Sequence, residues 1–566
     1  MDTNWGLYAL GAVAIAVILS WAPGRLRLSR AKHRSLTGHA KISRRLAGLV
    51  PFYSYGEEAF FASDGAPDEI AASRRAALER LARDYRDHHP NAGALGERLE
   101  SGVSDIAFTN AYRVPFQYRD YLREHLKVAS FAEESADVRV KDSDGNWSYD
   151  LTGSYGVNVF GYDFYKECID AGAARVRALG PVLGAYHPII EENVRRLREI
   201  SKLDEVSFHM SGTEAVMQAV RLAQYHTRRP KVVLFCGAYH GWWDGVQPGV
   251  GNPRRVTDVY TLEDMSERSL GVLRTRSDIA CVLVNPLQAL HPNRAAPSDG
   301  TLVDSSRSAH FDRAAYAQWL AKLRVVCTER GIALVFDEVF LGFRLARGGA
   351  QEYFGVRADL VTYGKTLGGG LPVGVLCGAH RFMKRFRDDR PSDVCLARGT
   401  FNSHPYVLGA MNEFLRRLDS SAIAATYERL DERWDGRAAA LNARLEAARL
   451  PVRVANLVSV WTILFTQPSR YNWMFQFYLK AEGLALSWVG SGRLIFSHNY
   501  SEADFAAVAE RFVRAAEAMR ADGWWWSAPA LTNKAIRQRS LREILRARFG
   551  RRAQAAAPEA LVNRRA

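Results

Sequence analysis

Short apolar runs alternate with longer amphipathic segments through the middle of this chain. The runs are apolar at every position rather than at every second one, which is typical of strands covered on both faces of a sheet. The segments between them have the length and spacing of helices, and this alternation predicts a mostly parallel α/β sheet. The six runs are VSFHM (206–210), KVVLFCG (231–237), IACVLVNP (279–286), ALVFDEV (333–339), DLVTYGK (359–365) and VGVLCGA (373–379).

The regions on either side of this sheet have different patterns. Residues 68–89 place apolar side chains at helical spacing and predict an amphipathic helix. A hairpin is predicted over 138–154, with Asp144-Gly145-Asn146 as its turn. After about residue 410, long helical segments and strand-like runs such as GRLIFSH (492–498) predict a second, α+β lobe.

The N-terminus carries an apolar stretch without a charge, WGLYALGAVAIAVILSWA (5–22). As a helix it would be about 27 Å long, close to the hydrocarbon thickness of a bilayer. Trp5 and Trp21 stand at its ends, where interfacial aromatic residues are expected. Basic residues follow the stretch rather than precede it, which favours an uncleaved single-pass anchor in the cytoplasmic (inner) membrane, with the body in the cytoplasm. A buried or interfacial helix is the alternative.

The net charge of +15 is concentrated in two flanks of the chain. Residues 23–48 and 531–566 each carry a net charge of +8, so the body between them is close to neutral, which argues against nucleic-acid binding. The cysteines form no C-x-x-C pair, which argues against a disulfide framework or a zinc site and favours a reducing compartment. They are Cys168, Cys236, Cys281, Cys327, Cys377 and Cys395.

The basic C-terminal flank also has an apolar component. Three tryptophans, 524–526, precede a basic segment that predicts an amphipathic helix. Such a helix suits an anionic membrane surface, and packing of its apolar face on the protein's own body is the alternative. The residues of that face are Leu541, Ile544, Leu545 and Phe549.

A lysine stands where one of the predicted strands ends. In LVTYGKTLGGGLPVG (360–374), Lys365 follows an apolar run and precedes a cluster of glycines. Burying an ammonium group costs several kcal/mol unless the group is paired, so a lysine at this place needs a reason. A surface lysine in a loop is the ordinary alternative. Because ligands of open α/β sheets bind at the carboxyl ends of the strands, the residues that follow the other runs decide between the two.

Three other strand ends carry residues that suit a ligand. Ser211-Gly212-Thr213 opens a helix whose free N–H groups suit a phosphate, although an ordinary N-cap would need no ligand. Tyr239 and His240 follow the second run, where an aromatic ring either stacks on a flat ligand or plugs the core. Asp337 ends an apolar strand, and its carboxylate needs a partner such as a protonated pyridine nitrogen or an arginine.

Together these groups describe a pocket for pyridoxal phosphate. They supply a phosphate cup, an aromatic stacker, a carboxylate for the ring nitrogen and a lysine that forms a Schiff base. In a Schiff base Lys365 is no longer a simple buried ammonium, and when it is freed it serves as a base.

At these residues the chain resembles the class III aminotransferases of fold type I, and among them most of all the glutamate-1-semialdehyde 2,1-aminomutases. The resemblance covers about residues 130–520. The matching motifs are SGTEAVMQAVRLAQ, GAYHGWWDG, FDEVFLGFR, DLVTYGKTLGGGLPVG and RGTFNSHP.

The resemblance implies roles for individual residues. Lys365 would be the Schiff-base lysine and Asp337 the partner of the pyridinium nitrogen. Thr400 would reach the phosphate bound to the other subunit of a homodimer. The other residues assigned to the cofactor are Ser211, Gly212, Thr213, Tyr239, His240, Gln288 and Val339.

Several features depart from the aminomutases. Asn285-Pro286 stands where the family usually has Glu-Pro, although Gln288 remains in place to contact the cofactor's phenolic oxygen. Aminomutases of tetrapyrrole synthesis have no membrane anchor, no long N-terminal extension and no basic tail. Arg113, in NAYRVPF, could match the arginine that binds the substrate carboxylate in those enzymes.

We therefore expect a membrane-anchored, pyridoxal phosphate-dependent aminotransferase that moves an amino group to a carbonyl substrate, either lipid-linked or carrier-bound. Intramolecular transfer, as in the aminomutases, is one alternative, and a non-catalytic membrane scaffold is another. No metal is expected. The expected parts are an anchor (1–24), a basic helical extension (25–125), the start of the small lobe (126–160), the large α/β domain (161–410), the rest of the small lobe (411–525) and a basic tail (526–566).

Overall fold

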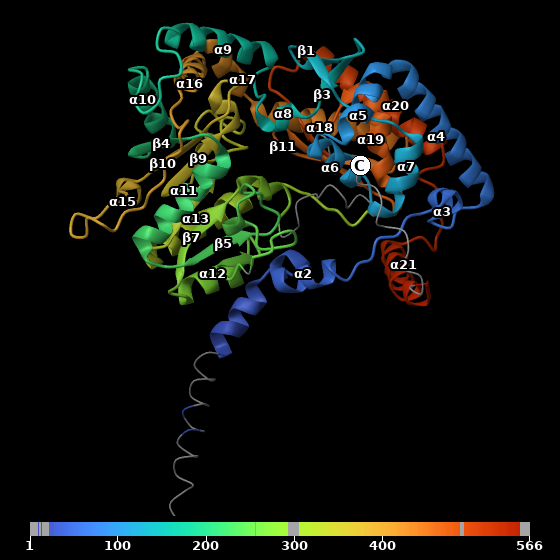
Figure 1. The fold of residues 1–566 in the computed structure, drawn as a ribbon, viewed down its shortest axis with the longest axis horizontal. Helices are drawn as coiled ribbons and strands as arrows, with labels where there is room; N and C mark the ends of the chain where they lie inside the picture. The colour runs from blue at the N-terminus through green and yellow to red at the C-terminus, as the bar shows by residue number, and fades with distance from the viewer. Residues whose placement is uncertain are drawn as a thin grey trace, which may run out of the picture. The chain divides into compact units, whose positions relative to one another are not determined.

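The chain folds into two compact units. The computed structural model describes residues 10, 13, 22–254, 256–292, 305–486 and 492–554. Unit 1 comprises Met1–Arg44, Gly156–Ala296 and Ala309–Asp431, and unit 2 comprises Arg45–Tyr155, Pro297–Ser308 and Glu432–Ala566. Figure 1 shows the elements of both units. Three helices cross a border between them: α2 (Ala40–Ala47), α8 (Gly153–Gly156) and α18 (Leu430–Ala447).

Seven strands form the central sheet of unit 1, in the order β4-β10-β9-β8-β7-β5-β6. β10 runs antiparallel to its neighbours β4 and β9, and the other neighbouring pairs are parallel. The mostly parallel sheet predicted from the sequence is therefore confirmed. Its strands are β4 (Glu205–His209), β5 (Lys231–Phe235), β6 (Val259–Leu262), β7 (Ile279–Val284), β8 (Ala333–Asp337), β9 (Leu360–Gly364) and β10 (Gly374–Gly378).

Both faces of this sheet are buried, as the unbroken apolar runs predict. Helix α11 (Gly212–Thr227) packs Val220 and Ala223 onto a face of the sheet that includes Val335. The next residues along the strands, such as Val233 and Leu334, point to the opposite face and are fully buried as well. The other helices of unit 1 are α9 (Tyr162–Val176), α10 (Ile190–Ser201), α12 (Glu267–Thr275), α13 (Arg313–Arg330), α14 (Gly349–Phe354), α15 (His380–Met383), α16 (Pro405–Arg417) and α17 (Ser421–Tyr427).

The edge strand β6 is paired with the N-terminal part of the chain. Lys32 forms an antiparallel bridge with Leu262, and the N–H of Glu263 donates to the carbonyl of Ala31 at 3.1 Å. Because β6 lies at the edge and most of its residues are only half buried, its sequence lacks the apolar run that reveals the other strands.

Unit 2 combines helices with two small sheets. The strand orders are β1-β2-β3-β13 and β11-β12-β14. The strands are β1 (Ala132–Ala136), β2 (Arg139–Asp142), β3 (Trp147–Asp150), β11 (Val452–Leu457), β12 (Val460–Phe465), β13 (Leu484–Ala485) and β14 (Arg493–Ile495). The remaining helices are α3 (Glu57–Ala62), α4 (Asp68–His88), α5 (Pro90–Glu100), α6 (Ser104–Tyr112), α7 (Arg119–His125), α19 (Phe475–Ala481), α20 (Glu502–Ala521) and α21 (Asn533–Gln554). The helix predicted over 68–89 and the hairpin that follows are both confirmed.

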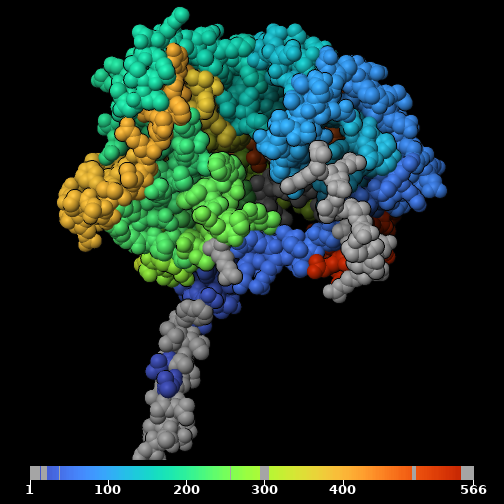
Figure 2. All heavy atoms as spheres, viewed as in Figure 1, coloured from blue at the N-terminus to red at the C-terminus, as the bar shows by residue number. Residues whose placement is uncertain are grey.

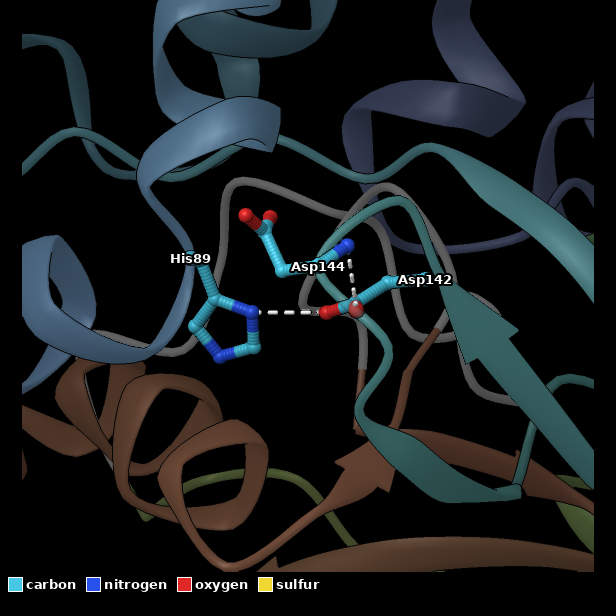
Figure 3. A group of neighbouring side chains, drawn as sticks. All are labelled: His89, Asp142 and Asp144. Atoms are coloured by element: carbon cyan, nitrogen blue, oxygen red, sulfur yellow. Dashed lines mark hydrogen bonds and ion pairs between the residues drawn. The ribbon is translucent and has the colours of Figure 1, made fainter.

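Two carboxylates fasten the turn of this hairpin to the start of α5 (Figure 3). Asp142 accepts hydrogen bonds from the ring of His89 at 2.7 Å and from the N–H of Asp144 at 3.0 Å. Asp144 accepts from the N–H groups of Asn91 and Ala92 at 2.7 and 2.9 Å. The cluster of one histidine and two aspartates is thus explained by turn and helix-start bonding.

A buried ion pair lies in the core of unit 2. Arg74 and Asp64 are fully buried, and the guanidinium binds the carboxylate through two hydrogen bonds of 2.9 and 2.7 Å. Arg74 also lies over the ring of Tyr471. Trp524 and Trp525 are buried in this unit, and their ring nitrogens donate to core residues. Trp524 and Trp525 are therefore core residues of unit 2.

The predicted anchor, residues 5–22, lies outside the described residues apart from Leu10, Val13 and Ala22. Among the residues that the structure describes, no helix has both the length and the hydropathy needed to cross a bilayer.

Candidate active site

The candidate residues of unit 1 come together because the strands that carry them run the same way. Lys365 directly follows β9, Asp337 ends β8, and Gln288 lies just after β7. Tyr239 and His240 follow β5, while Ser211 follows β4. Since these strands are mutually parallel, their carboxyl ends lie at the same edge of the sheet, where ligands of α/β folds bind.

Lys365 has a strained backbone and an unpaired side chain. Its φ of +48° lies in the left-handed region, which non-glycine residues occupy at a cost that is common at functional sites. Among the described residues, its ammonium nitrogen makes no hydrogen bond or ion pair, and it lies 5.8 Å from the ring centre of Phe340. Burial lowers the pKa of Lys365, which Asp337 partly offsets and Arg344 reinforces. Burial therefore makes the neutral, nucleophilic amine accessible at a lower pH than for a lysine in water.

The carboxylate of Asp337 is held from two sides. Its Oδ2 atom accepts from the ring nitrogen Nδ1 of His240 at 2.7 Å. Its Oδ1 atom accepts from the hydroxyl of Thr362 at 3.3 Å and from the N–H of Val339 at 3.2 Å. The partner of this buried carboxylate is thus a histidine rather than the arginine considered from the sequence.

The neighbouring acid, Glu338, serves a different purpose. Its carboxylate accepts from the N–H groups of Ala350 and Gln351 at 2.6 and 3.2 Å, at the start of α14. Burial raises the pKa of Glu338 to about 8. The carboxylate of Asp337 is therefore bonded to a candidate site residue, His240, whereas that of Glu338 is bonded to the start of α14.

The turn before α11 has the close packing of a phosphate cup. The hydroxyl of Ser211 accepts from the N–H of Glu214 at 3.3 Å, so Ser211 caps the helix. A Cβ atom at Gly212 would lie 2.5 Å from a methyl of Val339, and one at Gly241 would lie 2.5 Å from the hydroxyl of Thr213. The two glycines thus allow close packing of Val339 and Gly241 against the helix start, whose free N–H groups suit a phosphate.

Two buried polar atoms near these strand ends have no hydrogen-bond partner among the described residues. They are Nε2 of His240 and Oε1 of Gln288. The amide nitrogen of Gln288 donates to the carbonyl of Cys236 at 2.8 Å. Asn285 donates to the carbonyl of Tyr239 at 3.3 Å and accepts from the N–H of Leu287 at 3.1 Å, so it fixes the segment that carries Tyr239. Buried atoms left unpaired are costly, so this arrangement suits a polar ligand.

Sequence reasoning missed Phe340 and Arg344, although both lie in the quoted motif FDEVFLGFR. Arg344 is fully buried, and its guanidinium donates to the carbonyl of Asn158 at 2.9 Å. The guanidinium lies over the ring of Phe340. This ring packs against the backbone of Gly156, since a Cβ atom added at Gly156 would lie 2.5 Å from it. In the sequence, an arginine that follows the strand-end acid Asp337 within the same motif is the signal that could have revealed Arg344.

Two predicted residues are not joined to this group. Thr400 lies in an exposed turn of unit 1. Arg113 belongs to unit 2, where its buried Nε atom has no hydrogen-bond partner among the described residues. The cofactor and substrate roles of all candidate residues stay predictions.

The family of the chain is decided by a match over most of its length. The model of the family described as "Aminotransferase class-III" matches residues 121–515. The chain belongs to the class III aminotransferases. It is 31% identical to the glutamate-1-semialdehyde 2,1-aminomutase of Methanococcus maripaludis strain C7, over 59% of this chain and 76% of that protein. It is 30% identical to the enzyme of the same name from Geotalea daltonii, over 61% and 78%.

Solved structures agree with this family. A transaminase with PLP bound is 26% identical, with a TM-score of 0.58, over 70% of this chain and 92% of that one. A glutamate-1-semialdehyde aminomutase from Pseudomonas aeruginosa PAO1 has a TM-score of 0.63 at 19% identity, over 79% and 99%, and this likeness shows the fold alone. The fold is fold type I, and the chain is a pyridoxal phosphate-dependent enzyme.

The residues at the strand ends fit this cofactor. The start of α11 suits its phosphate, Asp337 suits its ring nitrogen, and Lys365 is an unpaired amine with a lowered pKa. When bound, pyridoxal phosphate supplies an aldehyde that links to amines and a ring that accepts an electron pair. The chain itself supplies a carboxylate fixed by His240 and a lysine that can take up or release a proton.

Proposed function

We propose that this enzyme is an aminotransferase that takes an amino group from a donor amino acid and passes it to a carbonyl substrate. The observation that carries the proposal is that two residues lie at the same edge of the sheet. They are Lys365, whose amine makes no hydrogen bond or ion pair with a described residue, and Asp337, whose carboxylate His240 fixes. The bonding of Asn285 into the segment of Tyr239, where the family usually has Glu-Pro, supports a reaction other than that of the aminomutases.

In this proposal each residue has a defined task. Asp337 would bind the ring nitrogen of the cofactor, because His240 and Thr362 hold its oxygens in place. Lys365 would move a proton at the substrate carbon when its nitrogen is free, and burial lowers the pKa of this amine from its usual value.

A half-reaction tests the transfer directly. Candidate donors such as glutamate or alanine are mixed one at a time with the purified enzyme, and the visible absorption of the lysine-bound cofactor is followed. At least one donor should bleach this absorption and release its keto acid. If none does, while glutamate-1-semialdehyde is converted to 5-aminolevulinate, the aminotransferase proposal is wrong.

Intramolecular amino transfer, as in a 2,1-aminomutase, is the second candidate. The relatives named above favour it, and so does Arg113, since its buried Nε atom lacks a partner among the described residues and a guanidinium suits a substrate carboxylate. Arg113→Met should then raise the KM for glutamate-1-semialdehyde at least tenfold, with cofactor binding unchanged. An unchanged KM would remove Arg113 from the substrate site.

We also propose that the enzyme is a homodimer. Several large apolar side chains of unit 1 are exposed, among them Trp242 (76%), Leu396 (73%) and Val250 (64%). Exposed residues of this kind mark interfaces. Tyr239 is also exposed, and so is Phe401, which follows Thr400 in the chain. Trp242→Glu should shift the mass measured by light scattering from dimer to monomer. A wild-type monomer would contradict the proposal.

Residues 5–22 support a further proposal, that the enzyme is anchored in a membrane and acts on a carbonyl compound located there, either lipid-linked or carrier-bound. The support is their sequence alone. Removal of residues 1–24 should shift the enzyme at least partly from the membrane fraction to the soluble fraction while the cofactor stays bound. Full-length enzyme found wholly in the soluble fraction would contradict the anchor.

A further inference from the structure

Helix α21, red in Figure 1, is bonded to the core of unit 2 through the face that carries Glu543. Its single acid, Glu543, accepts from Arg470 at 2.8 and 2.9 Å and from the hydroxyl of Tyr55 at 2.6 Å. Ile536, two turns earlier, is buried. With about 100° per residue, these two positions differ by about 20° around the helix, so they define its inner face.

The opposite face of α21 is apolar and exposed. Leu541, Leu545 and Phe549 have exposed fractions of 56%, 43% and 58%. These three side chains form a stripe that covers about 80° around the helix axis. The centre of this stripe lies about 170° from the centre of the inner face. Red atoms of this helix are visible at the surface in Figure 2. Of the predicted apolar face, Leu541, Leu545 and Phe549 are exposed and Ile544 is half buried, so the described part of the protein covers this face only in part.

Arginines border this stripe on both sides. Arg542 and Arg546 follow it around the helix in one direction, and Arg537 and Arg548 in the other, and all four are exposed. The one acid of the helix is turned inward, so the outer face presents no negative side chain from residues 533–549.

A neighbouring segment adds to the same surface. The side chain of Arg548 donates to the carbonyl of Leu49 at 2.6 Å, and Tyr53 donates to Glu543 at 3.2 Å. Residues 46–53 are thus held beside α21. The exposed apolar side chains of this segment are Leu46, Leu49, Val50 and Phe52, with exposed fractions of 40–46%.

We propose that α21 and residues 46–52 form a docking surface for a bilayer that contains anionic lipids. Apolar side chains enter the boundary between headgroups and acyl chains, while the bordering arginines contact lipid phosphates. A second copy of the chain fits less well, because a symmetric contact of this face would set arginines against arginines. The proposal concerns unit 2 and does not depend on which amino transfer the enzyme performs.

A fluorescent label on the full-length enzyme tests the docking surface. All six native cysteines are buried, so a Leu545→Cys variant can be labelled selectively with an environment-sensitive dye. The holoenzyme is reconstituted in phosphatidylcholine vesicles that contain phosphatidylglycerol and lipids brominated on the acyl chains. The dye should shift to the blue and be quenched. The same dye on Asp87→Cys, an exposed position of α4, should stay water-exposed. This design reports the position of α21 whether or not residues 5–22 span the bilayer.

Charge removal tests the role of the arginines. An arginine near an anionic surface contributes about fivefold to partitioning, so Arg542→Gln with Arg546→Gln should lower the ratio of inserted to free label about 30-fold. Arg83→Gln with Arg86→Gln, exposed on α4, should leave the ratio unchanged.

Three outcomes would overturn the proposal. The first is a dye at position 545 that stays water-exposed on anionic vesicles. The second is a lack of dependence on charge: quenching in pure phosphatidylcholine vesicles equals that in vesicles with phosphatidylglycerol, or the arginine substitutions do not change the quenching. The third is shielding of the dye without vesicles that grows with protein concentration, which would assign the surface to another protein chain.

Discussion

The close contact between Gly212 and Val339 gives a sharp prediction about the phosphate cup. A Cβ atom added at Gly212 would lie 2.5 and 2.9 Å from the two methyl carbons of Val339, distances at which one of the groups must move. Overpacking of this kind costs about 1–3 kcal/mol. Because the shift falls on the first residue of α11, Gly212→Ala should raise the dissociation constant of pyridoxal phosphate roughly 5- to 150-fold.

A double-mutant cycle assigns this penalty to Val339. Val339→Ala removes both methyl carbons and leaves its Cβ atom 3.3 Å from the added one, a contact that a small shift relieves. Gly212→Ala should therefore cost at least 1 kcal/mol less in the Val339→Ala background. Gly271→Ala, in α12 with open space around the added atom, is the control and should leave cofactor binding unchanged.

Spectrophotometric titration of the apoenzyme with pyridoxal phosphate measures each dissociation constant, and thermal unfolding measures stability in parallel. If Gly212→Ala lowers the melting temperature but leaves the dissociation constant unchanged, the contact is structural and Gly212 does not bind the cofactor. An equal penalty with and without the methyl groups of Val339 would show that the clash is not the cause.

Three further predictions follow from other contacts. Arg74→Met leaves Asp64 buried without its partner and should destabilise unit 2 by about 3–5 kcal/mol, with partial recovery in Arg74→Met/Asp64→Leu, as thermal unfolding can measure. Asp337→Asn should keep the cofactor bound but lower kcat at least tenfold, and full activity would refute its role at the ring nitrogen. Burial lowers the pKa of Lys365 below 10.5, so its neutral form appears at a lower pH than in water. Competitive acetylation of Lys365 in the apoenzyme should therefore rise with pH around a midpoint below 10.5. A midpoint at or above 10.5 would contradict the effect of burial.

The sequence reveals the sheet and the strand-end residues because both depend on local patterns. Strands buried on both faces leave unbroken apolar runs, and a polar residue at the end of such a run stands out, as Asp337 and Lys365 do. The edge strand β6 leaves no such run because it is only partly buried. Contacts between distant residues cannot be predicted this way, so the bond between His240 and Asp337, 97 residues apart, required the structure.

The C-terminal region shows a second limit of sequence reasoning. An amphipathic pattern identifies the apolar face of a helix but not which face the protein covers. In α21 the inward face is set by Glu543, whose partners Arg470 and Tyr55 lie far away in the chain. The adjacent Trp524 and Trp525 lie in the core of unit 2 and do not extend this exposed face.

Identification of the lysine that carries the cofactor tests the central claim most directly. The purified enzyme is loaded with pyridoxal phosphate, reduced with borohydride and digested, and the peptides are examined by mass spectrometry. The account predicts a phosphopyridoxyl group on the peptide that contains Lys365, and no such group at this position in Lys365→Ala. A label carried by another lysine, or an enzyme that takes up no label at all, would contradict it.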